Sequence, residues 1–161
     1  MSFESLNELV SCPCCGMTGV NTSVHDQKLC MVCAPAFALD DPDADTISTV
    51  IWLPQIDQGF LSRLIYAAYS ARLVQSNSNI LELDLAARSY DVLSELESLR
   101  AEAKRIIGTD QVSVLRRLIQ HIPQYSLFQR QNRPTGLRVL PLAPWFDIHA
   151  QDYRKLIAAR K

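Results

Sequence analysis

The spacing of the cysteines constrains this chain more than any other feature. All five cysteines lie close to the N-terminus, at Cys12, Cys14, Cys15, Cys30 and Cys33. Cys12 and Cys15 form one C-x-x-C pair, Cys30 and Cys33 form a second, and fourteen residues separate the two pairs. Two pairs at this distance are typical of a four-ligand metal site. We therefore predict that the N-terminal part of the chain folds around a metal ion.

Zinc is the metal that this donor set favours. Four thiolates close a tetrahedral shell at Zn–S distances of about 2.3 Å and leave no position for a catalytic water, so we expect a structural ion. Iron can bind to the same thiolates. Cys14 is then a surplus thiol that points away from the metal, although Cys14 or His25 could replace one of the four ligands.

Three other interpretations of the cysteines compete with a metal site. They are a disulfide framework, a redox-active C-x-x-C pair, and cysteines that only pack in the core. Five is an odd number for a disulfide framework. A redox pair requires a βαβ unit, and the segment before Cys12 is too short to supply one.

The residues around the cysteines predict a treble clef. Gly16 can take the positive φ of a tight turn after the first pair. The stretch between the pairs contains the turn formers of a short hairpin: Gly19, Asn21 and Thr22. Residues 34–39 can begin a helix, with Pro35 in its first turn. A knuckle, a hairpin, a second knuckle and a helix follow one another in a treble-clef zinc module.

The charge is divided unevenly along the chain. Residues 1–57 carry eight acids and one base, a net charge of −7, whereas residues 58–161 carry a net +6. The acidic stretch 40–45 (Asp-Asp-Pro-Asp-Ala-Asp) predicts a boundary between a zinc-binding module with its linker, residues 1–45, and a mainly helical body, residues 46–161. This stretch lacks the glycine and terminal glutamate of an EF-hand, so a solvated linker is favoured over a calcium site.

The rest of the chain predicts an α+β fold. We expect strands at residues 46–53 and 137–142, because these stretches are rich in β-branched and aliphatic side chains. The apolar periodicity predicts a helix over 58–75, and one long or two joined helices over 80–107 that end at Gly108. A further helix is expected to begin with Asp110 as its cap and to end at Pro123. A final helix is expected to begin at Asp147 or Asp152. We expect a zinc module packed on a helical body, and the length of the chain indicates that the two form one compact unit.

The sequence indicates a protein without catalytic activity. No nucleotide-binding glycine motif, zinc-protease motif or nucleophile elbow occurs, and the three histidines, His25, His121 and His149, are far apart. No apolar run is long enough to cross a membrane, and Glu4 stands where a secretory signal would have basic residues. We therefore expect a cytoplasmic protein.

With these features in view, the chain resembles the IcmJ/DotN family of Dot/Icm type IVB secretion and related conjugation systems. The resemblance rests on the two cysteine pairs followed by residues 49–58 (Thr-Val-Ile-Trp-Leu-Pro-Gln-Ile-Asp-Gln) and the helix that begins near Phe60. Residues 137–142 (Leu-Arg-Val-Leu-Pro-Leu), Phe146 and a terminal helix also resemble the C-terminal pattern of that family.

The resemblance implies an HNH-like treble clef in a scaffold or adaptor subunit of a type IV coupling complex. Such a subunit binds the C-terminal tail of the coupling ATPase, near small acidic adaptor proteins, on the cytoplasmic side of the membrane. The cargo, effector proteins or DNA, stays open. The hairpin between the cysteine pairs is shorter than the corresponding insert of the family, which puts any partner contact of that insert in doubt.

A groove between helices, or the edge of the strand that contains Trp52, could bind a helix or an extended peptide of the ATPase tail. Candidate apolar contacts are Trp52, Phe60 and Tyr66, and candidate basic contacts are Arg63, Arg72, Arg116 and Arg117. Core packing is the competing interpretation for the aromatic side chains, and solvated helix faces for the arginines.

Two nucleic-acid functions are the alternatives. A treble clef can bind DNA, and the stretch 130–133 (Arg-Gln-Asn-Arg) could contact phosphates, but the net charge of −7 in the first 57 residues would repel DNA. An HNH nuclease is disfavoured because only His25 lies in the hairpin, and Ala34 stands where such nucleases often have a histidine.

Overall fold

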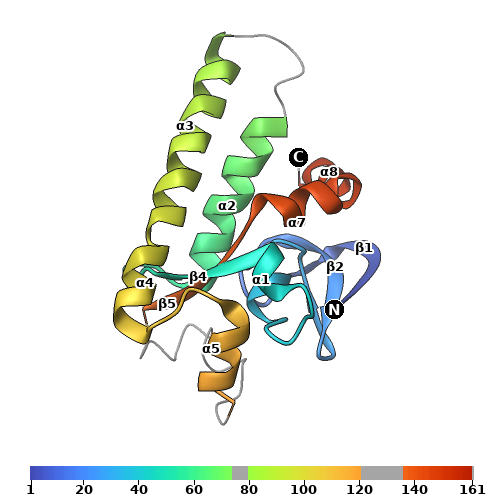
Figure 1. Cartoon of the computed structure of the whole chain (residues 1–161). Helices are drawn as coiled ribbons and strands as arrows, with labels where there is room; N and C mark the ends of the chain where they lie inside the picture. The colour runs from blue at the N-terminus through green and yellow to red at the C-terminus, as the bar shows by residue number, and fades with distance from the viewer. Residues whose placement is uncertain (74–79, 121–135, 161) are drawn as a thin grey trace.

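The computed structural model describes residues 1–73, 80–120 and 136–160 and shows an α+β protein (Figure 1). The strands are β1 (Ser2–Ser11), β2 (Thr18–Val24), β3 (Gln27–Leu29), β4 (Ser48–Trp52) and β5 (Leu137–Pro141). The helices are η1 (Ala34–Ala36), α1 (Ala44–Ile47), α2 (Gln58–Leu73), α3 (Ile80–Ser98), α4 (Arg100–Ile107), α5 (Val112–Leu118), α7 (Ala143–Ile148) and α8 (Ala150–Ala159).

The N-terminal module contains an antiparallel sheet in the order β1-β2-β3. The hairpin between the cysteine pairs is present, but its turn lies at His25 and Asp26, which have φ angles of 46° and 65°. The prediction of a turn at Asn21 and Thr22 is therefore wrong, because both residues lie buried within β2. The side-chain oxygen of Asn21 instead accepts a hydrogen bond of 2.9 Å from the Met31 N–H, inside the second cysteine pair.

Strand β1 has no clear counterpart in the sequence pattern. Most of its side chains are exposed, and only Phe3 and Leu6 are partly buried against the core. The register of its pairing with β2 shifts twice, between Phe3 and Asn7 and between Asn7 and Ser11. Such bulges interrupt the alternation of apolar and polar side chains that predicts a strand.

A two-stranded antiparallel sheet, β4 with β5, lies at the centre of the protein. Its register pairs Ser48 with Pro141 and Trp52 with Leu137, which confirms that the two predicted strands are partners. The first strand begins later than predicted, because residues 44–47 form the short helix α1. The Ser48 hydroxyl donates to the Ala44 carbonyl over 2.9 Å, so this side chain marks the end of the helix.

Both edges of this sheet are covered. On the free side of β4, the Val50 N–H donates to the Asp110 carbonyl over 2.9 Å, and the Trp52 N–H faces the Leu99 carbonyl at 3.4 Å. On the free side of β5, the buried side chain of Gln58 donates to the Val139 carbonyl over 2.8 Å and accepts from the Val139 N–H over 2.9 Å. The edge of the Trp52 strand is therefore not open to an added peptide strand, contrary to one of our predictions.

The predicted helices are present among the described residues, and the helix end expected at Pro123 lies outside that part of the chain. Helix α3 runs back alongside α2 (Figure 1), and the region 80–107 consists of two helices, α3 and α4. Gly108 ends α4 in a left-handed conformation, with φ of 80°. At the C-terminus, α7 begins at Ala143 and α8 at Ala150, so the predicted starts at Asp147 and Asp152 are wrong.

Asp110 does not cap the helix that follows it. Its carboxylate pairs with Arg100 at 2.7 Å and with Lys104 at 3.4 Å. Burial alone would raise the pKa of Asp110, but these two cations hold the pKa below its usual range. The interaction therefore contributes stability at neutral pH and is lost as the pH falls through this lowered pKa.

The N-terminus of α5 is capped by Asp45, from the acidic stretch. The Asp45 carboxylate accepts hydrogen bonds from the Ser113 N–H, at 2.9 Å, and from the Ser113 hydroxyl. An acidic side chain at this end of a helix satisfies an N–H group and interacts favourably with the helix dipole. The acidic stretch thus does more than the solvated linker that we predicted.

Gln58→Ala tests the cover of β5. Removal of this side chain leaves both backbone groups of Val139 buried without partners, so we expect the free energy of unfolding to fall by about 2–4 kcal/mol. Denaturant unfolding followed by circular dichroism measures this change. Gln55→Ala, at an exposed position nearby, is the control and is expected to change it by less than about 0.5 kcal/mol.

Candidate metal centre

Two tight turns present the cysteine pairs. The first follows β1, where the Gly16 N–H donates to the Cys12 carbonyl over 2.8 Å and the Cys12 N–H donates to the Met17 carbonyl over the same distance. Gly16 has φ of 74°, as the turn requires. The second turn follows β3, and the Ala34 N–H closes it by donating to the Cys30 carbonyl over 3.1 Å.

A 3-10 helix of three residues follows the second cysteine pair. Helix η1 comprises Ala34–Ala36 and has Pro35 in its first turn. Proline is tolerated there because the first N–H groups of a helix have no partner within it. The helix predicted from residue 34 is therefore a single turn.

The four predicted ligands lie together in one cluster. The Sγ atoms of Cys12, Cys15, Cys30 and Cys33 are all within 4.8 Å of one another, and all four residues are buried. The Cys15 and Cys30 sulfurs are 3.7 Å apart. Ligands at the vertices of a tetrahedral Zn–S₄ site are about 3.8 Å apart for a Zn–S distance of about 2.3 Å. The cluster therefore has the donor atoms and the size of a four-thiolate metal site.

The cysteines that form the cluster are free thiols without disulfide bonds. Contacts with the neighbouring thiols raise the pKa values of Cys15 and Cys30, and burial raises the pKa of Cys33. Four thiolates this close together would repel one another in a buried site. A divalent cation is the partner that would let all four ionise together.

Neither alternative ligand belongs to the cluster. Cys14 is only partly buried, and its backbone carbonyl faces Gly59 of α2. His25 lies in the exposed hairpin turn, where its Nε2 is 2.9 Å from the Asp40 carboxylate. Although partial burial opposes it, the His25 contact holds the pKa of Asp40 below its usual value.

The predicted partner-binding residues lie in several places. The guanidinium of Arg63 lies 5.3 Å from the centre of the Phe60 ring, which is 49% exposed, so these two residues of α2 adjoin. The Tyr66 ring is covered by Arg160 at 4.6 Å and contacts Tyr153 edge-on.

The remaining predicted residues lie apart from that pair. Trp52 is at the end of β4, where its ring lies against Gly136. Arg116 and Arg117 are exposed on α5. The stretch 130–133 lies outside the described residues.

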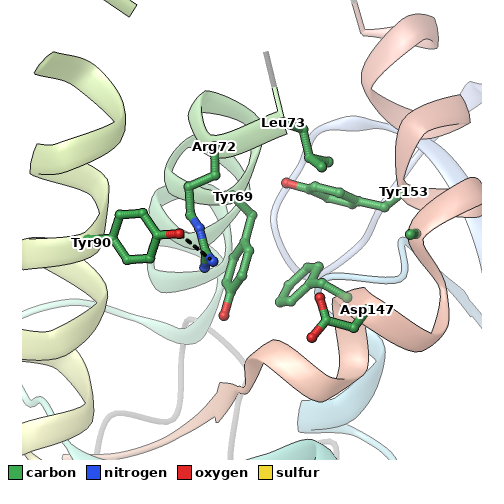
Figure 2. Close-up of a pocket in the computed structure, with 8 residues that line it drawn as sticks. Tyr69, Arg72, Leu73, Tyr90, Asp147 and Tyr153 are labelled. Carbon is green, nitrogen blue, oxygen red and sulfur yellow. Dashed lines mark hydrogen bonds between the residues drawn. The ribbon is translucent and has the colours of Figure 1, made fainter. Parts of the chain in front are cut away.

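A cavity of about 160 Å³ opens between α2, α3, α7 and α8 (Figure 2). It is lined by Tyr69, Arg72, Leu73, Tyr90, Phe146, Asp147, Ala150 and Tyr153. Its aromatic wall is built by Tyr69 stacked on Phe146, with ring centres 3.9 Å apart, and by the edge of Tyr153. The sequence did not predict this cavity, because its lining comes from helices that are distant in sequence.

Arg72 is the charged donor of this cavity. Its Nη2 donates to the Tyr90 hydroxyl over 3.1 Å, and its guanidinium lies 4.2 Å from the Tyr90 ring centre (Figure 2). No carboxylate pairs with Arg72 within the ranges that the structure describes. Burial raises the pKa of Tyr69 to about 12, so its hydroxyl stays a proton donor at neutral pH.

Comparison with known proteins gives no assignment: no protein-family model matches the chain, and neither does any curated protein. Over the described residues, the structure has no helix with the length and apolar character needed to cross a bilayer.

Substitution of any one ligand is the direct test of the centre. In Cys12→Ser, Cys15→Ser, Cys30→Ser and Cys33→Ser, we expect bound metal to be lost and the N-terminal module to unfold, because metal-binding energy in such sites is folding energy. Metal content per chain and circular dichroism measure the two effects. Cys14→Ser is the matched control and should retain its metal; the ligand set is misassigned if it loses metal while one of the four variants keeps it.

A second substitution tests the contact between this centre and α2. A Cβ atom at Gly59 would lie 2.2 Å from the Cys14 carbonyl oxygen, so only glycine allows this approach. Alanine favours helices by about 1 kcal/mol over glycine, yet we expect Gly59→Ala to lower the free energy of unfolding by about 1–3 kcal/mol. Thermal unfolding of the metal-loaded protein measures whether the stability falls or rises. An increase in stability would contradict the close contact.

Proposed function

We propose that this protein holds a structural zinc ion in a treble-clef module. The observation that carries the proposal is the cluster of four buried sulfurs from two turns. The order of β1, the β2–β3 hairpin and η1 around these turns supports the treble clef. Four thiolates complete the zinc shell, so the ion would stabilise the fold and would not activate water.

We propose further that the protein is a non-enzymatic adaptor in a type IV secretion or conjugation coupling complex. The resemblance to the IcmJ/DotN family supports this role. Its central motif, residues 49–58, corresponds to elements on which this fold depends: strand β4 and Gln58, which covers β5. The resemblance therefore includes structural elements of this chain and does not rest on the cysteine pairs alone, which are common in zinc modules.

The cavity next to Arg72 supports a peptide of the coupling ATPase as the partner. Its wall offers aromatic surface for an apolar side chain, and Arg72 together with the Tyr69 hydroxyl offers donors for a carboxylate. An acidic, partly apolar tail segment matches the aromatic wall and these donors, although the Asp147 carboxylate also lines the cavity. We therefore propose that the ATPase tail contacts this cavity and the exposed pair Phe60 and Arg63.

Affinity purification from the native host tests the adaptor role. The tagged protein is recovered at moderate salt with nuclease present, and its partners are identified by mass spectrometry. We expect a membrane-anchored ATPase and small acidic adaptors. Recovery of neither, with nucleic acid in a sample not treated with nuclease, would contradict the adaptor and favour the DNA-binding alternative. DNA binding would then weaken steeply from ~50 to ~200 mM salt.

Arg72→Gln tests the proposed place of the contact. Loss of a charge-assisted hydrogen bond of about 1.5–3 kcal/mol should reduce the affinity for the ATPase by about tenfold or more. Quantitative mass spectrometry of the recovered ATPase measures the reduction. Arg88→Gln is the control, because Arg88 is an exposed residue of α3 that pairs with Asp84 in its own helix. Equal recovery with both variants would exclude Arg72 from the contact.

A further inference from the structure

Arg160 reaches from the C-terminal end of α8 to the cysteine module. Its Nε donates to the Thr18 carbonyl over 2.6 Å, and its Nη1 lies 3.7 Å from the Met17 sulfur. Met17 and Thr18 directly follow the first cysteine turn. The guanidinium also lies over the ring of Tyr66, at 4.6 Å from the ring centre. The side chain is therefore held in one position on three sides.

One nitrogen of this guanidinium lacks an acceptor. Nη2 is buried and has no hydrogen-bond partner among the residues that the structure describes. No carboxylate within residues 1–73, 80–120 and 136–160 pairs with Arg160 either. A buried donor of a charged group that stays unpaired is costly, because it loses its hydrogen bonds to water without replacing them. Such a nitrogen in a folded protein calls for an acceptor that is present in the functional state.

The two hydrogen bonds of Arg160 are to residues directly after the first cysteine turn, so the guanidinium lies beside the module that carries the four clustered sulfurs. Burial alone would lower the pKa of Arg160, but Cys30 and, more weakly, Cys15 raise it. A zinc ion with four thiolates carries a net charge of −2 in a buried site. Charged sites of this kind require nearby donors, and hydrogen bonds to the ligands are known to tune metal affinity.

We propose that Arg160 is the positioning residue of the metal centre: its guanidinium donates to a thiolate of the cysteine cluster and offsets the negative charge of the metal-bound cluster. This role rests on the metal site of the proposed function. It also ties α8 to the N-terminal module, so that metal retention and the docking of the C-terminal helix depend on one side chain.

The packing around Arg160 favours this arrangement. Gly19 of β2 has φ of 87°, and a Cβ atom there would lie 2.9 Å from Leu156 and 3.8 Å from the Arg160 Nε. The absence of a side chain at Gly19 lets α8 approach the sheet. The Tyr153 hydroxyl donates to the Tyr66 carbonyl over 2.8 Å and holds α8 on α2. The position of Arg160 therefore does not depend on its own contacts alone.

The experiment compares Arg160→Gln and Arg160→Lys with Arg154→Gln, a matched control at an exposed position of α8. The full-length, zinc-loaded proteins are mixed with a chromogenic chelator, and the competition gives the zinc affinity. We expect Arg160→Gln to lower the affinity by about 10–100-fold, as for other groups that hydrogen-bond to metal ligands. Arg160→Lys keeps the positive charge but not the planar set of donors, so its zinc affinity should lie between those of Arg160→Gln and the wild type. The zinc affinity of Arg154→Gln should match that of the wild type.

The unfolding of metal-free and zinc-loaded forms separates this role from simple packing. If Arg160 acts through the metal centre, Arg160→Gln destabilises the zinc-loaded form more than the metal-free form. Equal destabilisation of both forms, or unchanged zinc affinity, would overturn the inference. Wild-type protein that binds no zinc at all would instead refute the metal site itself. In the cobalt-substituted protein, the thiolate-to-cobalt absorption should also shift in Arg160→Gln and stay unchanged in Arg154→Gln.

Discussion

The four buried sulfurs are the constraint on which the N-terminal module depends. The module has a small three-stranded sheet and a 3-10 helix of three residues, and most side chains of β1 face solvent. So little secondary structure offers few apolar contacts of its own. The fully buried residues near the second cysteine turn, Met31 and Val32, belong to the same hydrophobic core as β4 and the helices, so the module has no separate core of its own. A metal that joins both turns would provide the missing stabilisation.

Directional contacts join this module to the rest of the protein. The Trp145 indole N–H donates to the Met31 carbonyl over 2.9 Å, and Gly59 allows α2 to touch the first cysteine turn. Arg160 adds a third connection, from α8. Each of these contacts needs a specific atom at a specific distance, so the helices hold the two cysteine turns in a defined geometry. The boundary predicted near residue 45 is thus crossed by several contacts.

The candidate partner surface, the cavity next to Arg72, combines aromatic packing with a positive charge that no described carboxylate pairs with. The aromatic residues that line the cavity are mostly engaged with one another, whereas the charged donor Arg72 has no carboxylate partner among the described residues. Of the three aromatic residues expected to bind a partner, Phe60 is substantially exposed, whereas the Tyr66 ring is covered. Aromatic spacing along a helix predicts burial of one face but not which neighbour covers it.

The sequence by itself determined which four cysteines cluster, the strands β4 and β5 and most of the helices, because these features depend on residues close together in the chain. A C-x-x-C turn and an apolar period of 3.6 are local properties. Only the tertiary structure decided the cap of α5 by Asp45, the cover of β5 by Gln58 and the approach of Arg160 to the first cysteine turn. Their partners are 68, 81 and 142 residues away, respectively. The sequence does not show which distant backbone group a polar side chain will hydrogen-bond to. The packing of the elements between them brings the two groups together.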